Sequence, residues 1–208
     1  MVVATRQSDS MFSSGRLLDE DKINKALNNA SELGAEYAEI RLVSQTTNTA
    51  SLKDGKLERA IPGQEIGVTM RILADGAWGV HSTSDISSIP EQVGPTLRLA
   101  KAVAARRSSS QLPVGLAEVP IIEDVTHWRS VKDVRDTDLD TRIEMMLAID
   151  NEAKDHEHIV STSTGWSDEH IHTELMTTEG MNRVWSFQRS LINGMVTARE
   201  GSDVVSYS

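Results

Sequence analysis

The chain has 208 residues and a formal net charge of −10; 38% of its residues are hydrophobic, 4% are aromatic, and none is cysteine. This length allows one mixed domain or two small ones with a real core, and the missing cysteine excludes disulfide scaffolds, cysteine-ligated zinc and thiol nucleophiles. The acidic balance disfavours nucleic-acid partners, and no apolar run approaches the roughly 20 residues of a membrane span. We therefore expect a globular cytoplasmic protein with neither nucleic acid nor a membrane as partner.

The first part of the chain predicts a tail and then a helix. Residues 1–16 hold only a short apolar run, Val2–Ala4, which is too short for a signal peptide, and we expect a disordered tail. Asp19 or Asp21 can cap the helix that follows, and Gly34 is placed to end it. Apolar residues recur at helical spacing between them, namely Ile23, Ala26, Leu27, Ala30 and Leu33.

An antiparallel sheet is predicted over roughly 36–84, from segments in which apolar and polar residues alternate. Asp54-Gly55 and Asp75-Gly76 are predicted hairpin turns, because both residue types tolerate positive φ. Pro62-Gly63 is predicted to end one strand before the next begins. The predicted strands are AEYAEIRLVS, TTNTASL, KLERAI, IGVTMRIL and AWGVHS.

The remaining elements are a second helix, a linker, a third helix and further strands. Ser88 and Glu91 have the spacing of a capping box before the second helix, and residues 108–118 have the composition of a linker. A short strand is expected around VPIIEDV, and the third helix is expected to begin between Asp136 and Asp138. The expected apolar stripe of that helix is Leu139, Ile143, Met146, Leu147 and Ala153. The expected strands after it are EHIVSTSTG, EHIHTELMT, NRVWSFQRS and GMVTAREG.

This order predicts an α+β fold with antiparallel sheets packed against about three helices. We expect a helix–sheet–helix unit over 17–107, the linker over 108–118, and a helix with antiparallel strands over 119–208 that is continuous with the first unit. Acidic-Gly turn pairs recur in both parts, so two related helix-plus-sheet units are one interpretation and chance recurrence is another.

Four of the six histidines lie within DHEHIVSTSTGWSDEHIHTE, and they raise the question of a metal site. If a hairpin turned at 165–168, then His156, His158, His170 and His172 could share one face and bind zinc. The alternative is that His156 ends the third helix and the others lie on the wet face of strands. We favour this alternative and predict no metal site. The carboxylates Asp138 and Asp140 lie at a helix start, where capping accounts for them.

The segment GVTMRILADGAWGVHS offers the candidate for substrate binding. It places Arg71, Trp78 and His81 on a predicted hairpin, and arginine clamps carboxylates while tryptophan suits peptide contact. For these side chains taken alone we favour a purely structural interpretation, in which Trp78 fills the core between sheet and helix and Arg71 is solvated.

Several of these segments together resemble the TldD/PmbA family, whose members have also been called modulators of DNA gyrase. The resemblance rests on GAEYAEIRL, DGKLERA and GQEIGVTMRILADGAWGVHSTSD, followed by an alanine-rich helix, and it is clearest over 17–107. It implies a zinc-dependent peptidase that acts on peptides as a homodimer or heterodimer. It also implies a chain about twice this length, with an HExxxH zinc helix in its later part.

This sequence departs from the family pattern because it contains neither HExxxH nor cysteine. No catalytic or zinc residue is therefore carried over, and zinc is implied only for a separate catalytic half. The leading hypothesis is an N-terminal substrate-cleft and dimerisation part of such a peptidase, with Arg71, Trp78 and His81 as its candidate peptide contacts. A stand-alone module that binds a peptide or a partner is the second hypothesis. An independent metal-dependent enzyme that uses the histidines is the third.

Overall fold

The computed structural model describes residues 15–108, 112–127 and 131–208. The predicted tail therefore lies almost wholly outside the described residues. Within these ranges the helices are α1 (Glu20–Glu32), α2 (Val93–Ala105) and α3 (Leu139–Lys154), with short 3-10 helices η1 (Ile86–Gln92) and η2 (Val134–Asp136). The strands are β1 (Tyr37–Lys53), β2 (Lys56–Ala74), β3 (Ala77–Thr83), β4 (Glu123–His127), β5 (Ile159–Thr177), β6 (Asn182–Glu200) and β7 (Asp203–Tyr207).

The strands form one sheet with the order β3-β2-β1-β5-β6-β4, and β7 pairs with β6. The α+β prediction with antiparallel strands and three helices is confirmed for the described part of the chain. The chain divides into two compact units. Unit 1 consists of Met1–Val43, Gly67–Val125 and Thr173–Val184, and unit 2 of Ser44–Ile66, Thr126–His172 and Trp185–Ser208.

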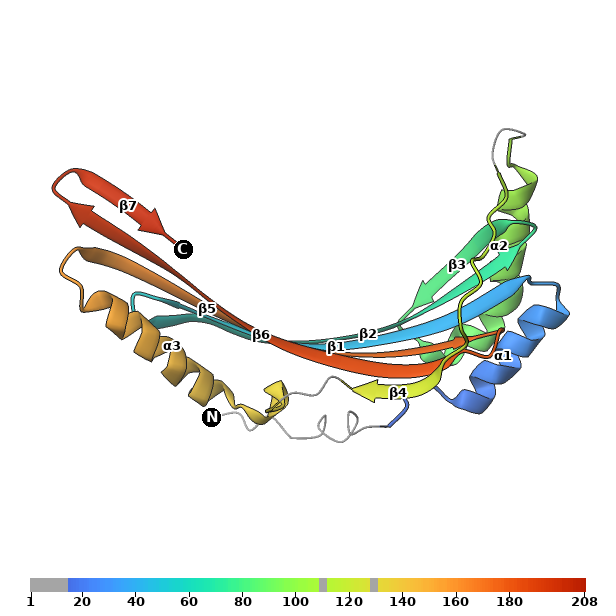
Figure 1. Ribbon diagram of the computed structural model, residues 1–208, viewed down its shortest axis with the longest axis horizontal. Helices are drawn as coiled ribbons and strands as arrows, with labels where there is room; N and C mark the ends of the chain where they lie inside the picture. The colour runs from blue at the N-terminus through green and yellow to red at the C-terminus, as the bar shows by residue number, and fades with distance from the viewer. Residues whose placement is uncertain (1–14, 109–111, 128–130) are drawn as a thin grey trace. The chain divides into compact units, whose positions relative to one another are not determined.

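In unit 1, α1 and α2 pack beside each other on the strands (Figure 1). Asp19 caps α1 by accepting a hydrogen bond from the backbone N–H of Lys22, and Gly34 follows the helix with φ +92°, as the sequence predicted. Alternate residues of β1 and β2 face these helices. They build a core from Ala38, Ile40, Leu42, Val68, Met70 and Ile72, together with Ile23, Leu27, Ile89 and Leu97.

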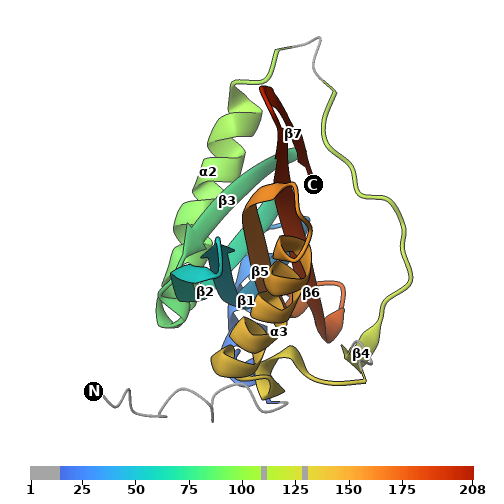
Figure 2. The same cartoon turned by 90° about the vertical axis from the view of Figure 1, so that its left-hand side faces the viewer.

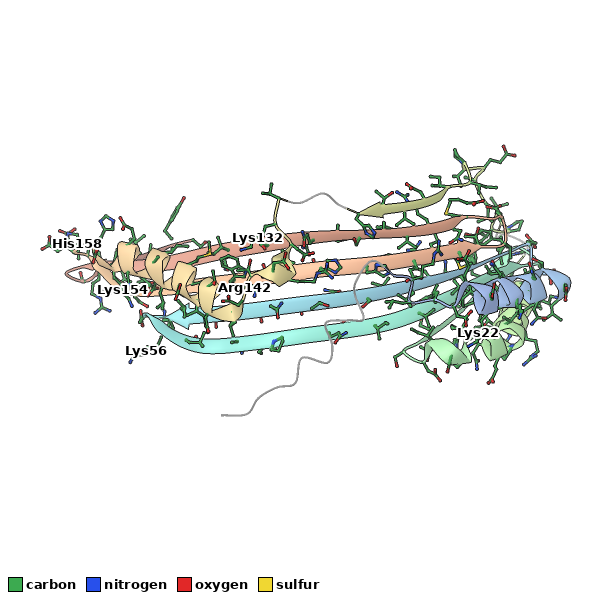
Figure 3. All side chains as sticks on the ribbon, turned by 90° about the horizontal axis from the view of Figure 1, so that it is seen from below. Lys22, Lys56, Lys132, Arg142, Lys154 and His158 are labelled. Atoms are coloured by element: carbon green, nitrogen blue, oxygen red, sulfur yellow. The ribbon has the colours of Figure 1, made fainter. Side chains whose placement is uncertain are left out.

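In unit 2, α3 lies over the strands, with Arg142 near its beginning (Figure 3). The apolar core is small and consists of Ala50, Leu52 and Met146, with Leu147 and Trp166 packed against it. The expected apolar stripe of α3 is wrong in part, because the helix buries Arg142 and Asp150 beside Met146 and leaves Leu139 41% exposed. The buried charges are accommodated because each has an ionic partner.

Both predicted hairpin turns are confirmed. Asp54 and Gly55 have φ values of 51° and 78°, and Asp75 and Gly76 have values of 51° and 68°. These are the left-handed conformations that a type I′ turn requires at its two central residues.

Four strand predictions are wrong, because β1, β2, β5 and β6 each run through two segments that were expected as separate strands. Pro62-Gly63 lies inside β2, in a stretch that β3 does not reach, since β3 pairs only with Val68–Ala74. Proline is tolerated in a strand whose one side has no partner there. β5 likewise continues through 165–168, where a Cβ on Gly165 would collide with the side chain of Asn193. Gly165 therefore lies within a continuous strand and does not mark a turn.

The start of α2 also differs from expectation. Asp85, rather than a capping box of Ser88 and Glu91, accepts the backbone N–H of Ser87 at 3.0 Å and begins η1, which leads into α2. Within the described ranges, no helix has the length and apolar character needed to cross a membrane.

Candidate functional site

The register of β2 and β3 separates the three predicted contact residues. Arg71 lies opposite Val80 and Leu73 lies opposite Trp78, whereas Met70 lies opposite His81. Directly opposed residues of an antiparallel pair share a face, and neighbours along a strand alternate. Arg71 and Trp78 therefore share one face of unit 1, and His81 lies on the other.

Helix α2 covers the face that carries His81. A Cβ on Gly79 would collide with the backbone of Thr96 and Ala100 in α2, and Gly79 alternates with Trp78 along β3. The interpretation of Trp78 as core filling between sheet and helix is therefore wrong. Its side chain lies on the opposite side of the sheet, half-buried.

Arg71 and Trp78 belong to a cluster with two residues of β1. Arg71 Nε lies 2.7 Å from Glu39 Oε1, and Tyr37 donates its hydroxyl to Glu39 Oε2 at 2.9 Å. The Arg71 guanidinium carbon lies 4.8 Å from the centre of the Trp78 ring, which is a cation–π contact. The Tyr37 and Trp78 rings meet edge-on, with centroids 5.9 Å apart. We call these four residues the Arg71 cluster.

The carboxylate of Glu39 is the centre of this cluster. Burial alone would raise the pKa of Glu39, but the hydrogen bonds from Arg71 and Tyr37 outweigh it and lower the pKa. In return, the hydrogen bond to Glu39 raises the pKa of Arg71. Burial and then the bond to Glu39 raise the pKa of Tyr37 as well. The cluster thus holds an ionised pair and a neutral phenol over the ordinary range of pH.

An extended segment, residues 112–122, runs on the side of the sheet away from α2 (Figure 2). We call it the strap. At its start, the Val114 N–H donates to Gly76 O at 2.8 Å, and at its end Ile122 O accepts from the Asn182 N–H at 3.2 Å. Its apolar side chains are largely exposed: Leu112, Val114, Leu116, Val119, Ile121 and Ile122.

The strap and the Arg71 cluster together give unit 1 a face with apolar, aromatic and cationic groups. Arg71 remains 42% exposed at its side chain although Glu39 and Trp78 hold it. Such a face can bind an extended peptide through apolar contacts and one charged contact.

The histidines are not gathered into a site. His156 and His158 are exposed beside the end of α3 and before β5, whereas His170 is half-buried and His172 is 8% exposed. The prediction that the histidines lie on the wet face is wrong for His172, because this face of β5 is buried, as Thr164 and Asp168 on the same face also show. Among the described residues, no three His, Asp or Glu side chains are placed to hold a metal ion. Asp138 caps α3 through the Thr141 N–H at 2.7 Å, as predicted.

The sequence did not reveal Tyr37 and Glu39 as members of the cluster. Alternation along β1 places them on one face, but only pairing with β2 shows that Glu39 meets Arg71. The sequence also did not reveal Asp168 of β5, which forms a buried ion pair with Arg142 of α3 and accepts a hydrogen bond from Trp166 Nε1 at 2.7 Å.

Comparison with known proteins places the chain in a family. A model of the PmbA/TldA metallopeptidase domain 1 matches residues 38–109, and one of the PmbA/TldA metallopeptidase central domain matches residues 132–208. A metalloprotease of Methanocaldococcus jannaschii is 27% identical over 191 residues, which cover 90% of this chain and 40% of the relative. A metalloprotease of Methanothermobacter thermautotrophicus is 28% identical over 145 residues, which cover 70% of this chain and 30% of the relative.

Solved structures share the fold. A proposed modulator of DNA gyrase from Thermotoga maritima superposes with a TM-score of 0.70 at 16% identity, over 90% of this chain and 41% of that one. Another proposed modulator, from Bacteroides thetaiotaomicron, superposes with a TM-score of 0.67 at 20% identity, over 92% of this chain and 44% of that one. TldE from Thermococcus kodakarensis superposes with a TM-score of 0.58 at 12% identity, over 88% of this chain and 40% of that one.

In every one of these comparisons the chain spans less than half the length of its relative. The two family models nevertheless follow one another along the chain and together match most of it. The chain therefore belongs to the PmbA/TldD family of metallopeptidases.

Proposed function

We propose that this chain forms the substrate-cleft and dimerisation part of a zinc-dependent peptidase that acts on peptides, with the Arg71 cluster as a peptide contact. The family membership supports a peptidase, and both curated relatives are metalloproteases. We choose this surface because Arg71 contacts both Glu39 and Trp78 and its side chain is still exposed to solvent.

The zinc of the family does not fit the residues present. The sequence has no cysteine and no HExxxH, and the described ranges hold no suitable group of three His, Asp or Glu side chains. Under this proposal, zinc belongs to a separate catalytic part.

The test is peptide binding by the 208-residue chain. A fluorescein-labelled, reduced and carboxymethylated lactalbumin fragment serves as an unfolded probe, and its anisotropy is followed during titration. Trp78→Ala and Arg71→Ala are expected to weaken binding. Arg98→Ala, which removes an exposed arginine from α2 on the other side of the sheet, is the matched control and is expected to bind as the parent does. Equal binding by all three variants would refute the assignment of this surface.

A stand-alone binding module without catalysis is the second candidate, supported by the exposed Arg71 guanidinium beside Trp78, which can contact a peptide in either case. An experiment that adds a purified catalytic half carrying HExxxH distinguishes the two proposed functions. Under the leading proposal the chain raises proteolysis of the labelled probe by that half, whereas a stand-alone module leaves the rate unchanged. Sedimentation velocity tests the dimerisation part of the proposal, for which we expect a dimer at high protein concentration.

A further inference from the structure

The geometry points to Arg71 as a clamp for a carboxylate of a bound peptide, either its C-terminal carboxylate or an acidic side chain. This inference rests on the proposed function and names the chemical group that the Arg71 cluster recognises. The hydrogen bonds within the cluster leave a defined set of Arg71 donors available.

Arg71 is fixed at one end of its guanidinium and unpaired at the other. Its Nε is bonded to Glu39, and the group lies over the Trp78 ring. Within the part of the chain that the structure describes, its only hydrogen-bond and ionic partner is Glu39, through Nε, so both Nη groups remain available. The outer edge of a guanidinium presents two parallel N–H groups, which match the two oxygens of a carboxylate.

The two partners orient this outer edge before any ligand arrives. Glu39 is 7% exposed at its side chain and is itself held by Tyr37. A guanidinium that is already oriented loses less conformational entropy when it binds an anion than a free arginine would. The arrangement therefore favours binding over a merely solvated charge.

Charges of both signs surround the cluster, because Glu179 acts on Tyr37 while a second arginine acts on Glu39. Arg41 follows Glu39 by two residues in β1, so it lies on the same face, and its charge acts on Glu39. The Trp78 ring beside Arg71 gives an aromatic surface for the uncharged part of the ligand. In an unmodified peptide the anionic groups are carboxylates, so a carboxylate is the ligand we infer.

The experiment compares carboxylate ligands with matched amides. N-acetylglycine and N-acetylglycinamide are titrated into the chain while the indole N–H resonance of Trp78, assigned with Trp78→Phe, is followed by NMR. We expect N-acetylglycine to shift this resonance and the amide to have an effect at least roughly tenfold weaker. Equal shifts from both compounds would overturn the inference, and so would no shift from either.

Three labelled alanine-rich peptides then identify the source of the carboxylate and separate this inference from the proposed function. One has a free C-terminus, one is amidated, and one is amidated with an internal glutamate. Tight binding of the first alone assigns the C-terminal carboxylate, and tight binding of the third assigns the side chain. Equal binding of all three would leave the proposed peptide contact standing but overturn the carboxylate clamp. If no peptide binds while N-acetylglycine still shifts Trp78, then the proposed function fails and the carboxylate site stands.

Two variants test the carboxylate clamp without exposing the protein to the unfolding that an unpaired buried charge would cause. Arg71→Lys retains the charge but loses the paired N–H groups, and we expect about a tenfold loss of affinity for the carboxylate ligand. The double variant Glu39→Gln with Arg71→Gln removes both charges without leaving a buried carboxylate unpaired. Circular dichroism confirms its fold, and an unchanged affinity for N-acetylglycine in either variant would contradict the clamp.

Discussion

Arg142 of α3 and Asp168 of β5 form an ion pair in the interior of unit 2, with Nε and Oδ2 2.5 Å apart and side chains only 6% and 2% exposed. Asp168 also accepts hydrogen bonds from Trp166 and Ser190, and Arg142 donates to the backbone oxygen of Val134. The pair therefore joins α3, η2, β5 and β6. Because the apolar core of unit 2 is small, this polar network is a principal means of holding α3 on the sheet.

Replacement of Asp168 by alanine tests this role. The change leaves Arg142 buried without its partner, and we expect the free energy of unfolding to fall by about 3–5 kcal/mol. Urea unfolding followed by circular dichroism measures it. Arg189→Ala is the control, because Arg189 pairs with Glu169 but is 72% exposed, and it should cost no more than about 1 kcal/mol. Similar unfolding midpoints for the two variants would contradict the role of the buried pair.

Gly79 allows α2 to approach β3. A Cβ at this position would collide with the backbone of Thr96 and Ala100, so Gly79→Ala should destabilise the protein by about 1–3 kcal/mol. Gly115 in the strap is the matched control, since a Cβ there meets nothing within 4 Å. Thermal unfolding should show a lower midpoint for Gly79→Ala than for Gly115→Ala. An unchanged midpoint for Gly79→Ala would mean that the helix moves away at little cost.

The pH dependence of unit 1 should report on Glu39. Its pKa in the folded state is lowered from the ordinary 4.5, so the unfolded chain binds a proton more readily than the folded one. The stability that Glu39 contributes is therefore complete above the ordinary pKa and is lost as the pH falls through the lower folded value. Urea unfolding over this acid range should show a shallower pH dependence for Glu39→Gln than for the parent. Parallel pH profiles would contradict the prediction.

His170 should make unit 2 less stable in mild acid. Burial lowers the pKa of His170 from its ordinary 6.5, and the positive charge of Arg135 lowers it further. The negative charge of Asp133 opposes this shift but has a smaller effect than Arg135. As the pH falls below 6.5 the unfolded chain takes up this proton first, so stability decreases until the lower folded pKa is passed. His170→Gln should remove part of this decrease, whereas His156→Gln, at an exposed position, should not. Unfolding midpoints measured between neutral pH and mild acid provide the comparison.

Zinc binding tests whether the histidines matter on their own. We expect the purified chain to carry far less than one zinc ion per molecule after dialysis, measured by plasma mass spectrometry. Replacing His170 and His172 by alanine should leave that content unchanged. Stoichiometric zinc that is lost in the double variant would favour the third hypothesis, an independent metal-dependent enzyme.

Much of the fold could be predicted because its signals are local. The Asp-Gly turns, the cap at Asp19 and the end of α1 at Gly34 depend on conformations of adjacent residues. Alternation in β1 and β2 likewise predicted which residues form the core of unit 1. The length of β2 and β5 could not be predicted, because whether Pro62 or Gly165 ends a strand depends on what lies beside it.

By itself the sequence determined the α+β class, the turns and the resemblance to the PmbA/TldD family. It also placed Arg71 and Trp78 on one hairpin. Tertiary structure alone decided that these two residues meet Glu39 and Tyr37, that His81 lies on the opposite face, and that Arg142 pairs with Asp168. The reason is that strand register and helix docking bring together residues far apart in the chain, and no local periodicity encodes which of them become neighbours.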